Sequence, residues 1–132
     1  MISSIICAQN NESTIYNCVN SFLKFCNEVI VVINNSTDCT WDIISDNFTN
    51  CKRLKKVLVN GNRDLSEARQ IGYTLSTQKW VIRADGDFVC YDSSDGIFNA
   101  HRLLDILNNI SFQTYPTLLS VPQLNIFNDI YT

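Results

Sequence analysis

Short, continuous runs of apolar residues alternate along the chain with segments whose apolar residues recur at helical spacing. The runs are rich in β-branched residues and end in polar turns, which is typical of strands buried on both faces of a parallel sheet. We predict strands at residues 2–8, 28–33, 53–59, 80–84 and 116–121, and helices at residues 13–25, 41–48, 65–75 and 97–110. This alternation predicts an α/β fold with a Rossmann-like, open, mostly parallel twisted sheet and helices on both faces.

Polar turns follow the strands at residues 9–12, 34–38, 60–64 and 85–87. The carboxyl ends of parallel strands lie at one edge of a sheet, where ligands of open α/β sheets bind. Donor-rich turns that lead into helices suit a phosphate-bearing ligand. Asp85 and Asp87 flank Gly86, and a divalent cation such as Mn²⁺ or Mg²⁺ would relieve their mutual repulsion and bridge to phosphates. The pattern predicts a site for a nucleoside diphosphate and a divalent cation.

Composition narrows the class of protein. The chain has 132 residues, which we treat as one domain, and a net charge of −3 that argues against a nucleic-acid partner. Its six cysteines form no C-x-x-C pair and it has one histidine, so we expect reduced, mostly buried thiols and no structural zinc. The first residues, MISSIICAQ, contain neither a signal peptide nor a membrane span. We therefore expect a cytoplasmic protein.

Three segments resemble glycosyltransferase family 2, which has the GT-A fold. IICAQNNESTI is similar to the family's IIPAYNEE, EVIVVINNSTDCT to EIIVVDDGSTDGT, and SEARQIGYTLSTQKWVIRADGDFV to AARNIGLELATGEYILFLDADD. The segments occur in the family's order and cover roughly residues 2–90. The resemblance implies a domain, residues 1–132, that binds a nucleotide sugar.

The resemblance also implies roles for individual residues. Asp85 and Asp87 match the family's D-x-D motif, which holds the metal on the donor diphosphate. The residues that would border the donor are Ala8, Gln9, Asn10, Glu12, Asn34, Arg69, Asp85 and Gly86. Helix capping is the alternative for Asn10 and Asn34, and a cap or turn role is favoured for Glu12 and Asp38. For Arg69 the alternative is a salt bridge on the helix surface.

The chain departs from the family at several positions. Ile33 and Asn34 replace the acidic pair of D-D-G-S, and Cys7 replaces the usual proline. No catalytic base is identified, because the remaining acidic candidates lie in no recognisable base motif; they are Asp92, Asp95, Asp105 and Asp129. The family's acceptor-binding C-terminal half has no counterpart in this sequence, so the chain corresponds to a truncated GT-A fold.

The implied activity is the inverting transfer of a sugar from a UDP- or GDP-linked donor to a hydroxyl-bearing glycan or lipid acceptor. One alternative is a binding or interaction module that keeps the fold without catalysis. A nucleotidyltransferase is disfavoured, because the turn at residues 9–12 lacks the glycines and basic residues that would hold a triphosphate. Surface left uncovered by the absent half predicts self-association.

Overall fold

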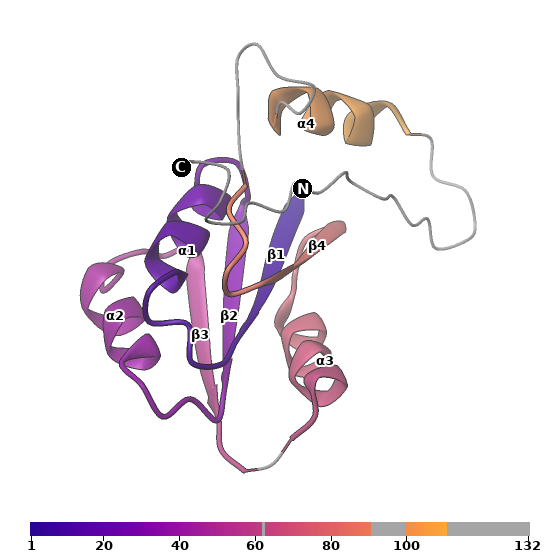
Figure 1. Cartoon of the computed structure of the whole chain (residues 1–132). Coiled ribbons are helices and arrows are strands. Elements are labelled where there is room, and N and C mark those ends of the chain that lie inside the picture. The colour runs from indigo at the N-terminus through magenta and orange to yellow at the C-terminus, as the bar shows by residue number, and fades with distance from the viewer. Residues whose placement is uncertain (62, 91–99, 111–132) are drawn as a thin grey trace, which may run out of the picture.

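The computed structural model describes residues 1–61, 63–90 and 100–110, and the strand predicted at residues 116–121 lies outside this part (Figure 1). The described chain contains a four-stranded, entirely parallel sheet in the order β3-β2-β1-β4. The elements are β1 (Ile2–Ala8), α1 (Ile15–Leu23), β2 (Glu28–Asn34), α2 (Thr40–Asn47), β3 (Leu54–Val59), α3 (Leu65–Leu75), β4 (Trp80–Asp85) and α4 (Ala100–Asn109). The predicted α/β fold with a parallel sheet is confirmed.

The strand register brings the ends of the strands together at one edge of the sheet. Ala8 lies opposite Ile33 in β2, and Cys7 lies opposite Asp85 in β4. Every residue of β1 and β2 is buried, as expected of the two central strands of a parallel sheet. We use the name carboxyl edge for the end of the sheet at which the strands terminate, together with the turns that follow them. The amino edge is the opposite end, at which the strands begin.

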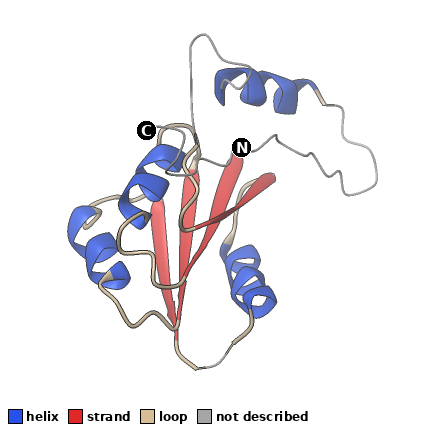
Figure 2. Ribbon diagram, in the orientation of Figure 1, coloured by secondary structure: helices blue, strands red, loops and turns tan. Residues whose placement is uncertain are grey.

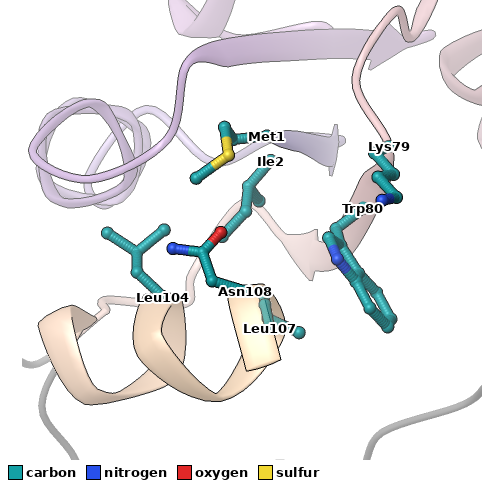
Figure 3. Close-up of a pocket in the computed structure, with 7 residues that line it drawn as sticks. All are labelled: Met1, Ile2, Lys79, Trp80, Leu104, Leu107 and Asn108. Atoms are coloured by element: carbon teal, nitrogen blue, oxygen red, sulfur yellow. The ribbon is translucent and has the colours of Figure 1, made fainter. Parts of the chain in front are cut away.

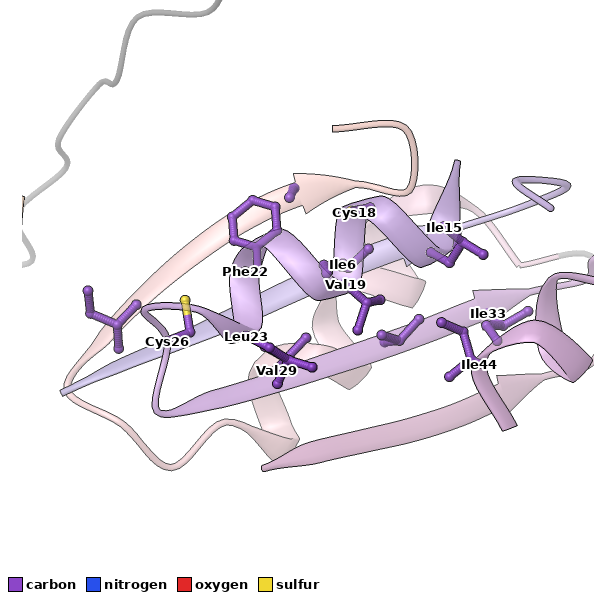
Figure 4. Close-up of a cluster of buried hydrophobic side chains, with 14 of the residues drawn as sticks. Ile6, Ile15, Cys18, Val19, Phe22, Leu23, Cys26, Val29, Ile33 and Ile44 are labelled. Carbon is purple, nitrogen blue, oxygen red and sulfur yellow. The ribbon is translucent and has the colours of Figure 1, made fainter. Parts of the chain in front are cut away.

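Helices cover both faces of the sheet (Figure 2), as predicted. Helices α1 and α2 pack on one face, where Ile15, Val19 and Phe22 of α1 are buried against β1 and β2 (Figure 4). These three residues lie at the i, i+4, i+7 spacing that places side chains on one side of a helix. The helical spacing of apolar residues in the sequence therefore identified the face of α1 that packs on the sheet.

Helix α3 covers the opposite face. Its Ala68 is buried against a second cluster that includes Ile5 and Ile30. A Cβ atom on Gly72 would lie 2.3 Å from Cγ2 of Ile5, so the absence of a side chain there lets α3 approach β1 closely. Leu65, which the sequence places in the apolar stripe of this helix, is instead 46% exposed. It occupies the first helical position, directly after the N-cap residue Asp64, and it does not reach the sheet.

Some local predictions are wrong. The polar turn before α2 predicts Ser36, Thr37 or Asp38 as the N-cap, but the N-cap residue is Cys39, which makes no side-chain cap hydrogen bond. Asp38 nevertheless accepts the N–H of Thr40, the first residue of α2, at 3.0 Å. The six cysteines form no disulfide in the described chain, but they are less buried than expected: Cys7, Cys18 and Cys26 are buried, Cys51 and Cys90 are partly buried, and Cys39 is exposed. Helix α4 is described over Ala100–Asn109, and the predicted start of this helix at residues 97–99 lies outside the described residues.

At the amino edge, the carboxylate of Glu28 joins several elements. It accepts hydrogen bonds from the Ser3 hydroxyl at 2.6 Å and the Thr77 N–H at 2.9 Å, and it forms an ion pair with Lys55. Burial acts to raise the pKa of Glu28, but these bonds outweigh it and lower the pKa to about 2. Glu28 is 6% exposed, so this ion pair ties β1, β2, β3 and the segment before β4 together.

Helix α4 also packs at the amino edge. Its Leu104 and Leu107 line a small cavity of about 120 Å³ together with Ile2 and Trp80, at the starts of β1 and β4 (Figure 3). The cavity is therefore at the end of the sheet remote from the turns predicted to bind a ligand.

Candidate functional site

The turns after β1 and β2 are joined by hydrogen bonds in both directions. Asn10 donates its backbone N–H to the Ser36 hydroxyl at 3.0 Å, and its side-chain oxygen accepts the Thr37 N–H at 2.8 Å. Asn10 and Asn35 both have positive φ, 53° and 52°, which asparagine tolerates better than most residues. Asn10 therefore links the turn after β1 to the turn after β2.

Glu12 and Asp38 add a second set of bonds between these turns. Asp38 accepts the Glu12 N–H at 2.9 Å, and Glu12 accepts the Cys39 N–H at 3.1 Å. Burial acts to raise the pKa of Asp38, but hydrogen bonds from Thr40 and Glu12 outweigh it and hold that pKa below its usual value. The turn role that the sequence favoured for Glu12 and Asp38 is present, and both side chains serve to join the two turns.

The acidic turn, residues 85–87, is held mainly through its backbone. Gly86 donates its N–H to the Cys7 carbonyl at 2.9 Å and accepts the Thr14 hydroxyl at 3.0 Å. A Cβ atom on Gly86 would lie 2.6 Å from Oδ1 of Asn11 and 3.0 Å from Cβ of Ala8. Gly86 is therefore required for close packing of the acidic turn against the first turn.

The two carboxylates of the acidic turn have different surroundings. Asp85 forms an ion pair with Arg69 of α3 at 3.2 Å, and its side chain is 43% exposed. Asp87 is exposed. The salt bridge considered for Arg69 from the sequence therefore exists, and its partner is the first aspartate of the D-x-D pattern.

Asn34 ends β2 on the face covered by α3. Its side chain is 7% exposed, and its Nδ2 donates to the carbonyl of Arg63 at 3.1 Å. Because that carbonyl can only accept, the amide nitrogen faces Arg63 and Oδ1 faces away. Oδ1 of Asn34 and Nε of Arg69 are buried atoms without a hydrogen-bond partner among the residues that the structure describes. Buried polar atoms are normally paired, so this end of the sheet has unused hydrogen-bonding capacity.

Two carboxylates suit a cation that also binds a ligand. Among the described residues no group of three or more His, Cys, Asp or Glu side chains could hold a metal ion. Mg²⁺ is usually held by one or two carboxylates together with substrate phosphates and water. Asp85 is partly exposed and Asp87 is exposed, on a turn with no side chain at Gly86, and the two carboxylates fit such a cation.

The structure brings most of the predicted site residues to the carboxyl edge. Ala8 contacts the position of Gly86, and Arg69 contacts Asp85. Gln9 is exposed, and its N–H donates to Asn11 at 2.8 Å. The sequence did not identify Asn11 and Thr14 as contacts of the acidic turn, because these contacts join positions far apart in the chain. Of the acidic candidates for a base, Asp105 lies on α4, while Asp92, Asp95 and Asp129 lie outside the described residues.

Comparison with known structures finds glycosyltransferases. The structure of S. aureus TarS 1-349 is 26% identical in sequence with a TM-score of 0.64, and the match covers 81% of this chain and 31% of that one. TarS 1-349 in complex with UDP-GlcNAc matches with a TM-score of 0.65 and 26% identity, over 81% of this chain and 30% of that one. The chain therefore spans about a third of the length of these neighbours.

Comparison with curated protein sequences gave no match. Over the residues that the structure describes, no helix has the length and apolar character needed to cross a membrane. A family model does match, and it extends over residues 3–97, from the start of β1 to beyond the acidic turn. On this match, together with the parallel sheet of the GT-A neighbours, the chain belongs to glycosyltransferase family 2.

Proposed function

We propose that this chain is the donor-binding half of a glycosyltransferase, which binds a nucleoside diphosphate sugar and a divalent cation at the carboxyl edge. One observation carries the proposal: the partly exposed carboxylate of Asp85 and the exposed carboxylate of Asp87 lie at the same edge as the buried atoms of Asn34 and Arg69 that have no partner among the described residues. A metal-bound diphosphate with its nucleoside presents the complementary groups. The UDP-GlcNAc and UDP complexes of TarS support the same class of ligand.

Asn34 can meet a base only as an acceptor. Its Nδ2 is occupied by the Arg63 carbonyl, so the side chain offers a ligand the acceptor Oδ1. Uracil and guanine carry a ring N–H that can donate to Oδ1, and cytosine and adenine carry an exocyclic amino group that can do the same, so this acceptor alone does not select the base. We infer a UDP- or GDP-linked donor from the family, and the UDP complex of TarS favours UDP.

The acidic turn would act on the leaving group. When bound, Mn²⁺ or Mg²⁺ supplies positive charge that neutralises the departing nucleoside diphosphate. Asp85 and Asp87 would hold this cation, and Arg69 would keep Asp85 oriented through their ion pair. The turn formed by Ala8, Gln9, Asn10 and Glu12 would form the wall of the nucleotide site. Transfer of the sugar to a hydroxyl group of a glycan or lipid, with inversion, would need a base that these residues do not include.

Calorimetric titration of UDP, GDP and CDP, with and without Mn²⁺, tests the proposal on the wild type and on the variant Asp85→Asn/Asp87→Asn. We expect Mn²⁺-dependent binding of UDP or GDP, weak binding of CDP, and loss of the metal dependence in the variant. The amide substitution keeps the shape of each side chain, so a change in binding reports on charge. Failure of the wild type to bind any of the three nucleotides would refute the donor site.

A non-catalytic binding module is the second candidate, because Ile33 and Asn34 stand where the family has acidic residues. Nucleotide binding without transfer by the isolated chain would fit both candidates. Addition of a separately produced acceptor-binding half distinguishes them: transfer of sugar from UDP-GlcNAc would establish the enzyme, and its absence would favour the binding module.

A further inference from the structure

Thr14 occupies the N-cap position of α1 but does not cap that helix. Its side chain makes no cap hydrogen bond, although threonine at this position commonly accepts an N–H of the first turn. Its hydroxyl instead lies 3.0 Å from the Gly86 carbonyl, 72 positions further along the chain, and 3.4 Å from the Asn11 carbonyl. A hydroxyl has one hydrogen to donate, and the shorter distance assigns it to Gly86.

This bond completes the attachment of the acidic turn. The Gly86 N–H is bonded to Cys7, and the Asp85 carbonyl accepts the Phe88 N–H at 3.0 Å and the Cys18 thiol at 3.5 Å. Burial raises the pKa of Cys18 to about 12, so this thiol keeps its proton and remains a donor at neutral pH. The Gly86 carbonyl immediately precedes Asp87, and Thr14 is its hydrogen-bond partner on α1.

We propose that Thr14 is a positioning residue for the cation site. By holding the carbonyl that precedes Asp87, its hydroxyl fixes the orientation of the peptide plane between Gly86 and Asp87 and therefore the direction in which the Asp87 carboxylate leaves the turn. The same bond fixes the acidic turn to the N-terminus of α1 and so to the first turn, since Asn11 packs against Gly86. This inference rests on the proposed function, because it assigns Asp87 to the cation.

The test compares Thr14→Val with Thr14→Ser. Valine keeps the β-branched shape and removes the hydroxyl, whereas serine keeps the hydroxyl. Because Thr14 does not cap α1, valine leaves the helix without the loss that usually follows removal of an N-cap. Thr49→Val is the matched control, since the Thr49 hydroxyl bonds only to carbonyls of its own helix region, Ser45 at 2.9 Å and Asp46 at 3.1 Å.

Two measurements are made on each variant. Titration of UDP in Mn²⁺ is expected to show about fivefold weaker binding in Thr14→Val, the size of effect that follows loss of one hydrogen bond. Binding by Thr14→Ser and Thr49→Val is expected to match the wild type. Amide hydrogen exchange, followed by NMR without any ligand, is expected to be roughly tenfold faster at Gly86 and Phe88 in Thr14→Val. The amides of Ile30 and Val31 in β2 should be unchanged.

The outcomes separate this inference from the proposed function. The inference is overturned if Thr14→Val binds UDP and exchanges its amides as the wild type does. It is also overturned if Thr14→Val exchanges faster but binds UDP and Mn²⁺ with unchanged affinity. If the wild type does not bind UDP with Mn²⁺, the proposed function fails. Hydrogen exchange alone then shows whether the Thr14 hydroxyl holds the acidic turn in place. Exchange at Gly86 that is accelerated by valine and not by serine then supports the role of Thr14, and equal exchange in both refutes it.

Discussion

At the amino edge of the sheet the Glu28 carboxylate is buried and surrounded by donors from Ser3, Thr77 and Lys55. At the carboxyl edge Asp85 is partly exposed and Asp87 is exposed, and among the described residues the buried Oδ1 of Asn34 has no hydrogen-bond partner. Both edges concentrate polar groups, but within the described chain a buried atom without a partner accompanies exposed carboxylates only at the carboxyl edge. This difference supports the ligand site that we propose at the carboxyl edge, whereas the bonds of Glu28 stabilise the fold.

Ser4, in the middle of β1, is a useful contrast to both edges. Its hydroxyl is also buried without a partner, but it lies in a strand that is buried along its whole length. No exposed charged group belongs to that strand. An unpartnered atom therefore indicates a site only where it accompanies accessible functional groups, as Asn34 accompanies the acidic turn.

The largest expected effect comes from Gly86→Ala at the carboxyl edge. The added Cβ would meet Asn11 at 2.6 Å, so we expect unfolding to become easier by roughly 2–3 kcal/mol and metal-dependent UDP binding to be lost. Gly72→Ala is the control, because its Cβ would meet Ile5 at 2.3 Å inside the core. Thermal unfolding should show that Gly72→Ala loses stability, and calorimetry should show that its folded fraction still binds UDP with the metal. Equal binding by both variants would contradict the assignment of the site.

Glu28→Gln is expected to weaken the fold and leave the ligand site alone. The substitution removes the charge that pairs with Lys55 while keeping the size of the side chain, and we expect a loss of about 2 kcal/mol in the free energy of unfolding. Urea unfolding measures this loss, and UDP titration should give the wild-type affinity. A change in affinity without a loss of stability would reverse the roles that we assign to the two edges.

Lowering the pH should reduce the free energy of unfolding through the same residue, Glu28. The pKa of Glu28 is about 2 in the folded chain, below the ordinary 4.5 expected when unfolded, so the folded state favours the ionised form. Its contribution is present above pH 4.5 and is lost as the pH falls toward 2. With allowance for solvent screening at Lys55, which is 42% exposed, we expect a loss of about 1 kcal/mol between about pH 5 and about pH 3. Unfolding curves of Glu28→Gln should show a correspondingly smaller decrease over this interval.

Asn34→Leu should have the smallest effect on folding. Leucine has the same branched shape with the same number of side-chain heavy atoms and removes the unpartnered Oδ1, which offsets the lost bond to Arg63, so stability should change by less than about 1 kcal/mol. UDP binding should weaken by about tenfold, because the acceptor for the base is gone. Urea unfolding and calorimetry measure the two quantities. Unchanged affinity would remove Asn34 from the site.

The sheet was predictable from the sequence because its physical signal is local. The continuous apolar runs of β1 and β2 and the helical spacing of Ile15, Val19 and Phe22 each report burial directly. The family resemblance located the acidic turn, and the rule for parallel sheets located its edge. The exposure of Leu65 was missed because spacing gives the face of a helix and does not show how far along that face the sheet extends.

The polar contacts were much less predictable. Glu28 begins an apolar run, and nothing adjacent to it in the sequence reveals that Ser3, Lys55 and Thr77 will surround it. Thr14 similarly resembles an ordinary cap residue until β4 brings Gly86 beside it. A hydrogen bond between distant positions leaves no periodic pattern, so only the folded structure distinguishes a satisfied polar group from an available one.

The bond between Thr14 and Gly86 also has a consequence for the order of folding. It joins residues 72 positions apart, and the pairing of Cys7 with Asp85 in the β1–β4 register closes a loop of similar size. Long-range pairings carry a larger entropic penalty of loop closure and form slowly, whereas β1, α1 and β2 form a compact local unit. We therefore expect the acidic turn to take its final position late in folding, after the surface that receives it has formed. A nascent chain that has not yet paired β4 with β1 would hold the proposed wall of the nucleotide site without the acidic turn that we assign to the cation.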